Sequence, residues 1–213
     1  MKGLRLIAEE LSCRRGGRMV FSNLSFAVES GEMLILRGPN GAGKTSLLRT
    51  IAGLTPPASG RLILEGGSDD LTIGQQAHYI AHQNASKPQL SVRENLYFWQ
   101  RFLGGDERAI AAAMEAMDLV HLADYDAALL SAGQKRRLAL ARLLLAERPL
   151  WLLDEPTVGL DVASVERLRT VMDAHLNAGG IIIATTHIDL GMAQARTFEF
   201  REEHWAVQLE GFD

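Results

Sequence analysis

The sequence predicts an α/β fold with an N-terminal antiparallel β region, a helical insert and a core of buried strands. Short apolar or alternating runs, bounded by glycine and polar clusters as strands are, occur at 4–8, 24–28 and 33–36. Helix-forming sequence begins near Ser91. Two later runs, 150–153 and 181–185, are short and leucine-rich or β-branched, which is typical of buried parallel strands. We therefore expect a helical subdomain, at about 85–145, inserted into an α/β core.

Within that middle section, two stretches indicate helices. Ser91 and Glu94 have the Ser-x-x-Glu spacing of a capping box, in which each side chain bonds the other residue's backbone N–H. An alanine-rich stretch from Arg108 to Val120 continues the helical pattern.

Composition restricts the class of protein. The chain has 213 residues, of which 47% are hydrophobic and 23% charged, so one globular domain over 1–213 is expected. The net charge of -4 provides no overall basic field, and nucleic acid is not expected as a partner. The single cysteine, Cys13, has no partner for an intrachain disulfide and is expected to be structural.

The N-terminal residues and the lengths of the apolar runs indicate where the protein resides. Acidic residues Glu9 and Glu10 lie where a signal peptide would need an apolar core, so we expect no targeting segment and a cytoplasmic location. The apolar runs are also far shorter than the roughly 18 residues of a spanning helix. Contact with a membrane would then require a membrane-embedded partner.

A phosphate-binding loop is predicted at GPNGAGKT, which fits G-x-x-x-x-G-K-[ST] between a strand candidate and a helical pattern. Its glycines let backbone N–H groups converge on phosphate oxygens, and the following helix adds its positive N-terminal end. Lys44 is expected to contact the β- and γ-phosphates, Thr45 to bind Mg²⁺ and Ser46 to donate a further hydrogen bond. The predicted nucleotide-binding residues of this loop are Gly38, Pro39, Asn40, Gly41, Ala42, Gly43, Lys44, Thr45 and Ser46.

Two adjacent carboxylates follow the apolar run LWLLDEP. Asp154, at the end of the predicted strand, can hold Mg²⁺ through water, and Glu155 can polarise an attacking water. This pair favours a hydrolase over a kinase, in which Glu155 would serve no water.

The stretch LSAGQKRRLALARLLLA begins with a second capping box, Ser131 to Gln134, ahead of a predicted helix. The bare N–H groups of Ala132 and Gly133 also form a potential anion site, so this helix can cap itself or bind a phosphate. The basic run from Lys135 to Arg137 is expected to be a solvated helix face.

These motifs, together with GLD at 159–161 and a histidine ending the IIIATTH run, resemble the nucleotide-binding subunits of ABC transporters over essentially the whole chain. The resemblance implies a P-loop NTPase (RecA-like) core of the ABC ATPase type that binds ATP and Mg²⁺. It also implies a homodimer arranged head to tail around two ATP molecules. In that arrangement the signature residues Ser131, Ala132, Gly133 and Gln134 bind the ATP of the opposing subunit. Ala132 replaces the family's usual glycine, but alanine is acceptable at a first helical position.

The resemblance assigns roles to further residues. Gln83, in YIAHQN, corresponds to the loop glutamine that reaches Mg²⁺ and the attacking water, and His187 to the histidine that contacts the γ-phosphate. Asp161 corresponds to the aspartate at the dimer seam. Arg15 falls where the family stacks an aromatic residue on adenine, and a guanidinium can also stack on a base.

The compact length and the LSAGQKRRLALARLLL wording resemble the CcmA family, the ATP-binding subunit of the haem exporter in cytochrome c maturation. This implies a peripheral protein on the cytoplasmic face of the bacterial inner membrane with integral-membrane partners, powering release of a haem-loaded chaperone. Direct haem binding is not expected. The other histidines are expected to be ordinary side chains: His78, His82, His121, His175 and His204.

Alternatives remain from the residues alone. They are an ABC ATP-binding subunit for another substrate, a soluble ABC-type ATPase acting on nucleic acid or ribosomes, and a P-loop kinase. Aromatic residues from Tyr97 to Phe102 either pack inside the insert or form a docking surface for a membrane partner.

Overall fold

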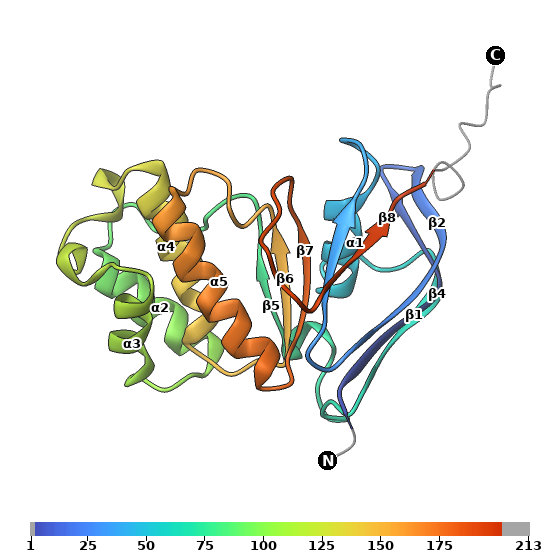
Figure 1. The fold of residues 1–213 in the computed structure, drawn as a ribbon, viewed down its shortest axis with the longest axis horizontal. Coiled ribbons are helices and arrows are strands. Elements are labelled where there is room, and N and C mark those ends of the chain that lie inside the picture. The colour runs from blue at the N-terminus through green and yellow to red at the C-terminus, as the bar shows by residue number, and fades with distance from the viewer. Residues whose placement is uncertain (1–2, 202–213) are drawn as a thin grey trace.

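A computed structural model of the protein describes residues 3–201 and contains two sheets (Figure 1). The first is antiparallel, with strand order β2-β1-β4, and is formed by β1 (Arg5–Arg15), β2 (Arg18–Glu29) and β4 (Ser59–Glu65). This is the N-terminal β region that the sequence predicts. The expectation for His204 lies outside the described residues.

The second sheet is parallel and forms the centre of the fold, with strand order β5-β6-β7-β3-β8. Its strands are β3 (Met33–Arg37), β5 (Ala77–Ile80), β6 (Leu150–Asp154), β7 (Ile181–Thr185) and β8 (Ala195–Glu199). All residues of β6 and β7 are buried, which confirms the prediction of buried parallel strands. The edge strand β8 is mostly exposed or half-buried and lacks the apolar run by which β3, β6 and β7 were predicted; β5, at the other edge, was not predicted either.

Both faces of the parallel sheet are covered, as parallel sheets require. Helix α1 (Lys44–Ile51) packs on one face together with the antiparallel sheet, in a core that contains Leu36 and the buried Cys13. Helix α5 (Val162–Asn177) and the helical insert pack on the other face, in a core that contains Leu153. Figure 1 accordingly places α1 and α5 on opposite sides of the sheet.

The insert between β5 and β6 contains α2 (Val92–Leu103), α3 (Ala109–Ala116) and α4 (Ala132–Ala141). Both predicted capping boxes are formed, at Ser91 with Glu94 and at Ser131 with Gln134. Helix α3 stops short of Val120 because Asp118 adopts a left-handed φ of 52°, which a helix cannot continue through. Short 3-10 segments lie at Gly74–Gln76, Val120–Leu122, Ala127–Leu129 and Arg142–Leu144.

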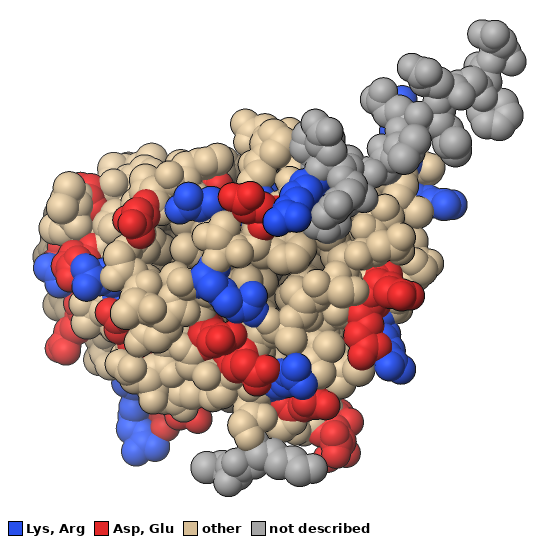
Figure 2. Space-filling model, turned by 45° about the vertical axis from the view of Figure 1, so that its right-hand side comes forward, with Lys and Arg blue, Asp and Glu red and all other residues tan. Residues whose placement is uncertain are grey.

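The sheet order determines where the functional motifs meet. Strand β7 lies between β3 and β6, and the carboxyl ends of all three parallel strands therefore lie at the same edge. The residues that follow them, including the phosphate-binding loop and Glu155, converge there. Figure 2 shows a face of the molecule on which acidic and basic side chains are interspersed. Among residues 3–201, no helix is both long enough and apolar enough to span a membrane.

Candidate nucleotide-binding site

The predicted phosphate-binding loop connects β3 to α1. Gly43 caps α1 with a φ of 105°, and a Cβ at this position would lie 3.0 Å from Cγ1 of Val20. Glycine is therefore required for both conformation and space. The Lys44 ammonium donates hydrogen bonds to the carbonyl oxygens of Gly38 and Pro39, at 2.7 and 2.9 Å, which keeps it folded over the loop. The first N–H groups of α1 have no partner within the helix and are available to an anion.

A hydroxyl and carboxylate cluster lies beside the start of α1. In the sheet register Asp154 of β6 is paired with Thr185 of β7. The Thr185 hydroxyl donates to Oδ1 of Asp154 at 2.9 Å, and the Thr45 hydroxyl donates to Oδ2 at 3.0 Å. Within residues 3–201 the buried Asp154 carboxylate has hydroxyl partners and no cation within ion-pair distance. A buried carboxylate with such hard oxygen neighbours fits a divalent cation such as Mg²⁺.

Glu155 has a strained backbone, with a φ of 48°. A left-handed conformation at a non-glycine residue costs on the order of 1–3 kcal/mol and persists only where surrounding contacts impose it. Here the Glu155 N–H donates to the Thr185 hydroxyl at 2.8 Å. The turn aims the carboxylate at the site, where its Oε1 lies 3.2 Å from Nε2 of His187.

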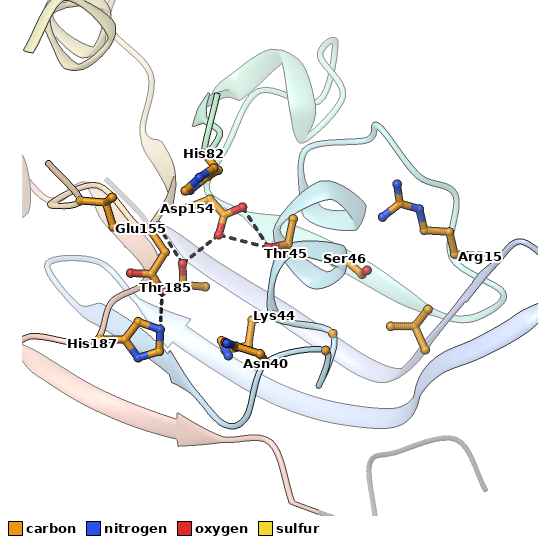
Figure 3. Close-up of a pocket in the computed structure, with 14 residues that line it drawn as sticks. Arg15, Asn40, Lys44, Thr45, Ser46, His82, Asp154, Glu155, Thr185 and His187 are labelled. Atoms are coloured by element: carbon orange, nitrogen blue, oxygen red, sulfur yellow. Dashed lines mark hydrogen bonds and ion pairs between the residues drawn. The ribbon is translucent and has the colours of Figure 1, made fainter. Parts of the chain in front are cut away.

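These residues line an open cavity of about 600 Å³, within the size range of small-ligand sites (Figure 3). In the close-up, His187 and Glu155 lie at one side of the cavity and Arg15 at the other, with Lys44 between them. The predicted site residues that line the cavity are Arg15, Asn40, Gly41, Gly43, Lys44, Thr45, Ser46, Asp154, Glu155 and His187.

Four lining residues were not predicted from the sequence: Val20, His82, Val158 and Thr185. Val20 and Thr185 belong to strands in which the sequence indicates no site role for either side chain, and only the tertiary arrangement of the strands places them here. His82 was expected to be an ordinary side chain, yet it lines the cavity, whereas its neighbour Gln83 is exposed and does not. The role assigned to Gln83 stays a prediction.

The signature residues lie away from the cavity of their own chain. None of the four at 131–134 lines it, and α4 packs on the sheet face opposite to α1. Ala132 is the first residue of α4, as expected, and has no positive φ. Asp161 caps α5, because its carboxylate accepts a hydrogen bond from the Ser164 N–H at 2.8 Å and this contact lowers the pKa of Asp161. Its place at a dimer seam stays a prediction.

The expected solvated basic face of α4 is wrong for two of its three residues. Arg136 is only 3% exposed and bonds the backbone that follows β6. Arg137 bonds the carbonyl of Met117 and both the carbonyl and the carboxylate of Asp118. Both guanidinium groups face into the protein because the irregular segments packed against α4 present carbonyl oxygens that need donors.

Two of the remaining histidines lie on the far side of the parallel sheet, His78 buried and His175 half-buried. The His175 ring stacks on Trp151, with centroids 3.9 Å apart, and His78 contacts the same indole edge to face. Burial lowers the pKa of each histidine to about 4. His121 is exposed, 3.8 Å from a carboxylate oxygen of Asp118. In the described part of the chain, no cluster of three histidine, cysteine or acidic residues could hold a metal ion.

Comparison with known proteins agrees with this geometry. Residues 21–158 match the family described as ABC transporter. The chain is 56% identical to the cytochrome c biogenesis ATP-binding export protein CcmA of Rhodopseudomonas palustris strain BisB5, over 86% of this chain and 92% of that protein. It is 54% identical to the CcmA protein of Nitrobacter winogradskyi, over 89% of this chain and 95% of that protein.

Solved structures show the same fold. The cbiO1 protein of Clostridium perfringens, part of the ABC transporter complex cbiONQ, has a TM-score of 0.77 at 25% identity, covering 97% of this chain and 88% of that chain. An ATP-binding subunit of an ABC transporter also has a TM-score of 0.77, at 28% identity, covering 85% of this chain and 79% of that chain. The chain therefore belongs to the ABC transporter ATPases, and among them to the CcmA family of ATP-binding export proteins.

Proposed function

We propose that this ATPase powers haem export in cytochrome c maturation, as a head-to-tail homodimer that drives integral-membrane partners from the cytoplasmic face of the bacterial inner membrane. The observation that carries the hydrolytic part is a single cavity lined by Lys44, Asp154 and the Glu155–His187 pair. The export part rests on the name carried by its CcmA relatives. One domain is proposed over 1–213, with the helical subdomain at about 85–145.

Hydrolysis follows from the positions of the lining side chains. Lys44 and the N–H groups at the start of α1 bind the β- and γ-phosphates of ATP. Glu155 accepts a proton from a water whose oxygen bonds to the γ-phosphorus, while the bond from that phosphorus to the bridging oxygen breaks and ADP leaves. His187, 3.2 Å from Glu155, contacts the γ-phosphate and holds the carboxylate in place.

The residues proposed to hold Mg²⁺ are Thr45, Asp154 through water, and Gln83. Thr45 and Asp154 are already hydrogen bonded to each other, so their oxygens face the same point. When bound, Mg²⁺ neutralises negative charge on the phosphate oxygens. The cavity extends past Ser46 to Arg15 and Val20, where we place the adenine ring.

The dimer would complete each site with the signature residues of the opposing subunit. Exposed apolar side chains surround the elements concerned: Leu129 (74% exposed) precedes the signature, Val158 and Val162 flank the GLD segment, and Ile188 follows His187. Exposed apolar side chains at these positions favour a protein interface there. Asp161, between two of them, would lie at the seam.

We place the membrane partner against the start of the helical insert. Phe98 and Phe102 are 38% and 71% exposed and stack on each other with centroids 6.5 Å apart. Trp99 packs edge to face against both rings, and the Lys87 ammonium lies 4.2 Å from the centroid of Phe98. An exposed aromatic pair beside a cation suits a partner segment that is apolar with an acidic residue.

The test is purification of the chain from its native membrane with the subunits that accompany it, identified by mass, followed by phosphate release. Phosphate should be released from ATP without any added acceptor, and a haem-loaded chaperone should stimulate the rate. Phosphate transfer only to an added acceptor would indicate a kinase. Co-purification with a transporter that is indifferent to haem would assign another substrate, and co-purification with ribosomes or nucleic acid would contradict the transport function.

A further inference from the structure

Arg136 uses all five of its N–H donors on one junction of the protein. Its Nε donates to the carbonyl of Pro156 at 3.0 Å, and one terminal nitrogen donates to the carbonyls of Asp154 and Glu155, each at 2.8 Å. The other terminal nitrogen donates to the carbonyl of Ala81 at 2.8 Å and to Oδ1 of Asn84 at 3.2 Å. The side chain is almost wholly buried.

Three segments distant in sequence meet at this guanidinium. The first is α4, which carries both Arg136 and, one turn earlier, the signature residues. The second is the turn at 154–156, which carries the proposed base Glu155. The third is the segment 81–84, which contains His82 and Gln83 and follows β5. Only a planar group with five donors can bond both non-helical segments at once, and lysine cannot replace it.

The turn that Arg136 holds is the strained one. Glu155 has its left-handed φ of 48° at the point where its carbonyl accepts the Arg136 hydrogen bond and its N–H bonds Thr185. Such a conformation requires contacts on both sides of the residue to persist. The carboxylates of Asp154 and Glu155 also offset the cost of burying the Arg136 charge, whose pKa is lowered by burial and raised by these two neighbours.

A second contact joins α4 to the same turn. A Cβ on Gly133 would lie 2.7 Å from the carbonyl oxygen of Gly159, so the signature packs directly on the GLD segment of its own chain. Helix α4 therefore contacts both ends of the segment 154–159, through Arg136 at 154–156 and through Gly133 at Gly159.

We propose that Arg136 is a positioning residue for hydrolysis, which fixes the backbone of Glu155 and of the segment 81–84 to the signature helix. The signature of one chain and the base of that same chain then move as one body. This rests on the proposed function, because it takes Glu155 as the base. Arg136 itself touches no substrate.

The experiment compares Arg136→Lys and Arg136→Met with Arg137→Met as a matched control, in the complex with the membrane subunits. Arg137 also makes three part-buried hydrogen bonds from α4, but only to Met117 and Asp118. Both Arg136 variants should lower kcat about ten- to a hundredfold with KM for ATP nearly unchanged, because misplacing a catalytic group affects the reaction more than binding. Arg137→Met should retain kcat.

Hydrogen exchange supplies a readout independent of activity. In the Arg136 variants the amides at 155, 157–159 and 81–84 should exchange faster than in the parent, while those of α1 stay unchanged. The Lys variant keeps the charge, so it carries the test where the Met variant does not fold. Unchanged exchange and kcat, or an equal loss of kcat in Arg137→Met, would overturn the proposal. A parent complex that releases no phosphate would contradict the proposed function alone, since the exchange result would still stand or fail by itself.

Discussion

Nε2 of His187 lies 3.2 Å from Oε1 of Glu155, and this contact joins the loops after two neighbouring strands, β7 and β6. The side chain of Glu155 is 17% exposed, whereas that of His187 is 68% exposed. The carboxylate is thus held inside the site and the imidazole stands at its rim. An arriving phosphate or opposing subunit would meet His187 first, and its displacement would be transmitted to the proposed base.

Glu155→Gln should preserve ATP affinity and lower hydrolysis by about two orders of magnitude or more, because the amide cannot accept the proton of the attacking water. The backbone turn should be retained, since glutamine has the same shape. The measurement is nucleotide binding and phosphate release on the same preparation. Glu166→Gln, at an exposed ion pair on α5, is the matched control and should hydrolyse normally. Near-normal turnover in Glu155→Gln would refute the assignment.

Arg15→Ala should weaken ATP binding only a few-fold, because stacking by a guanidinium at an exposed site contributes about 0.5–1 kcal/mol. Arg15→Tyr should restore or improve the affinity, since an aromatic ring can stack on adenine. Arg14→Ala is the control, as Arg14 is equally exposed but does not line the cavity. Equal ATP affinity in the parent and in both Arg15 variants would place the base elsewhere.

Mixing Ser131→Arg and Lys44→Ala chains should restore ATP-dependent association that neither homodimer has. The Ser131→Arg chain has a blocked signature but an intact phosphate-binding loop. The Lys44→Ala chain has a disabled phosphate-binding loop but an intact signature. A mixed dimer therefore has one complete site. Some hydrolysis should return with association unless both sites must act together, and association is therefore the primary measurement. Mixed dimers that form but bind ATP no better than either parent would mean that the signature acts within its own chain or only as a helix cap.

The unfolding free energy should fall as the pH is lowered from about 6.5 to 4. Burial depresses the pKa of His78 and of His175 to about 4 in the folded chain, against about 6.5 for histidine in unfolded chains. The unfolded chain therefore binds more protons in this window. The contribution of the two neutral histidines to the unfolding free energy is fully present above pH 6.5. It is lost as the pH falls to 4, by up to about 3 kcal/mol for each histidine.

The check is urea unfolding between pH 4 and 7.5. His175→Phe keeps an aromatic ring against Trp151 and should flatten the pH dependence by roughly half. His121→Asn, at an exposed position, should leave the dependence unchanged. An unaltered slope in His175→Phe would show that this histidine does not bear the proton uptake.

The sequence by itself determined the local features of this protein. The phosphate-binding loop, the carboxylates after β6 and the capping boxes at Ser91 and Ser131 are each set by a few consecutive residues, whose conformations depend on their own spacing. The apolar runs at 150–153 and 181–185 likewise determined that β6 and β7 would be buried. The comparisons confirm the family resemblance, whereas the roles that it implies for residues whose partners lie elsewhere stay predictions.

Only the tertiary structure decided which distant groups meet. The sheet register places Thr185 against Asp154, and the path of the segment 81–84 after β5 places His82 at the cavity. The packing of α4 buries Arg136, which the sequence pattern had indicated as solvated. A charged side chain on an amphipathic helix reads as exposed unless the carbonyl oxygens that will bind it are known. Those oxygens belong to irregular segments, at 81 and 154–156, whose path is set by long-range packing rather than by local periodicity.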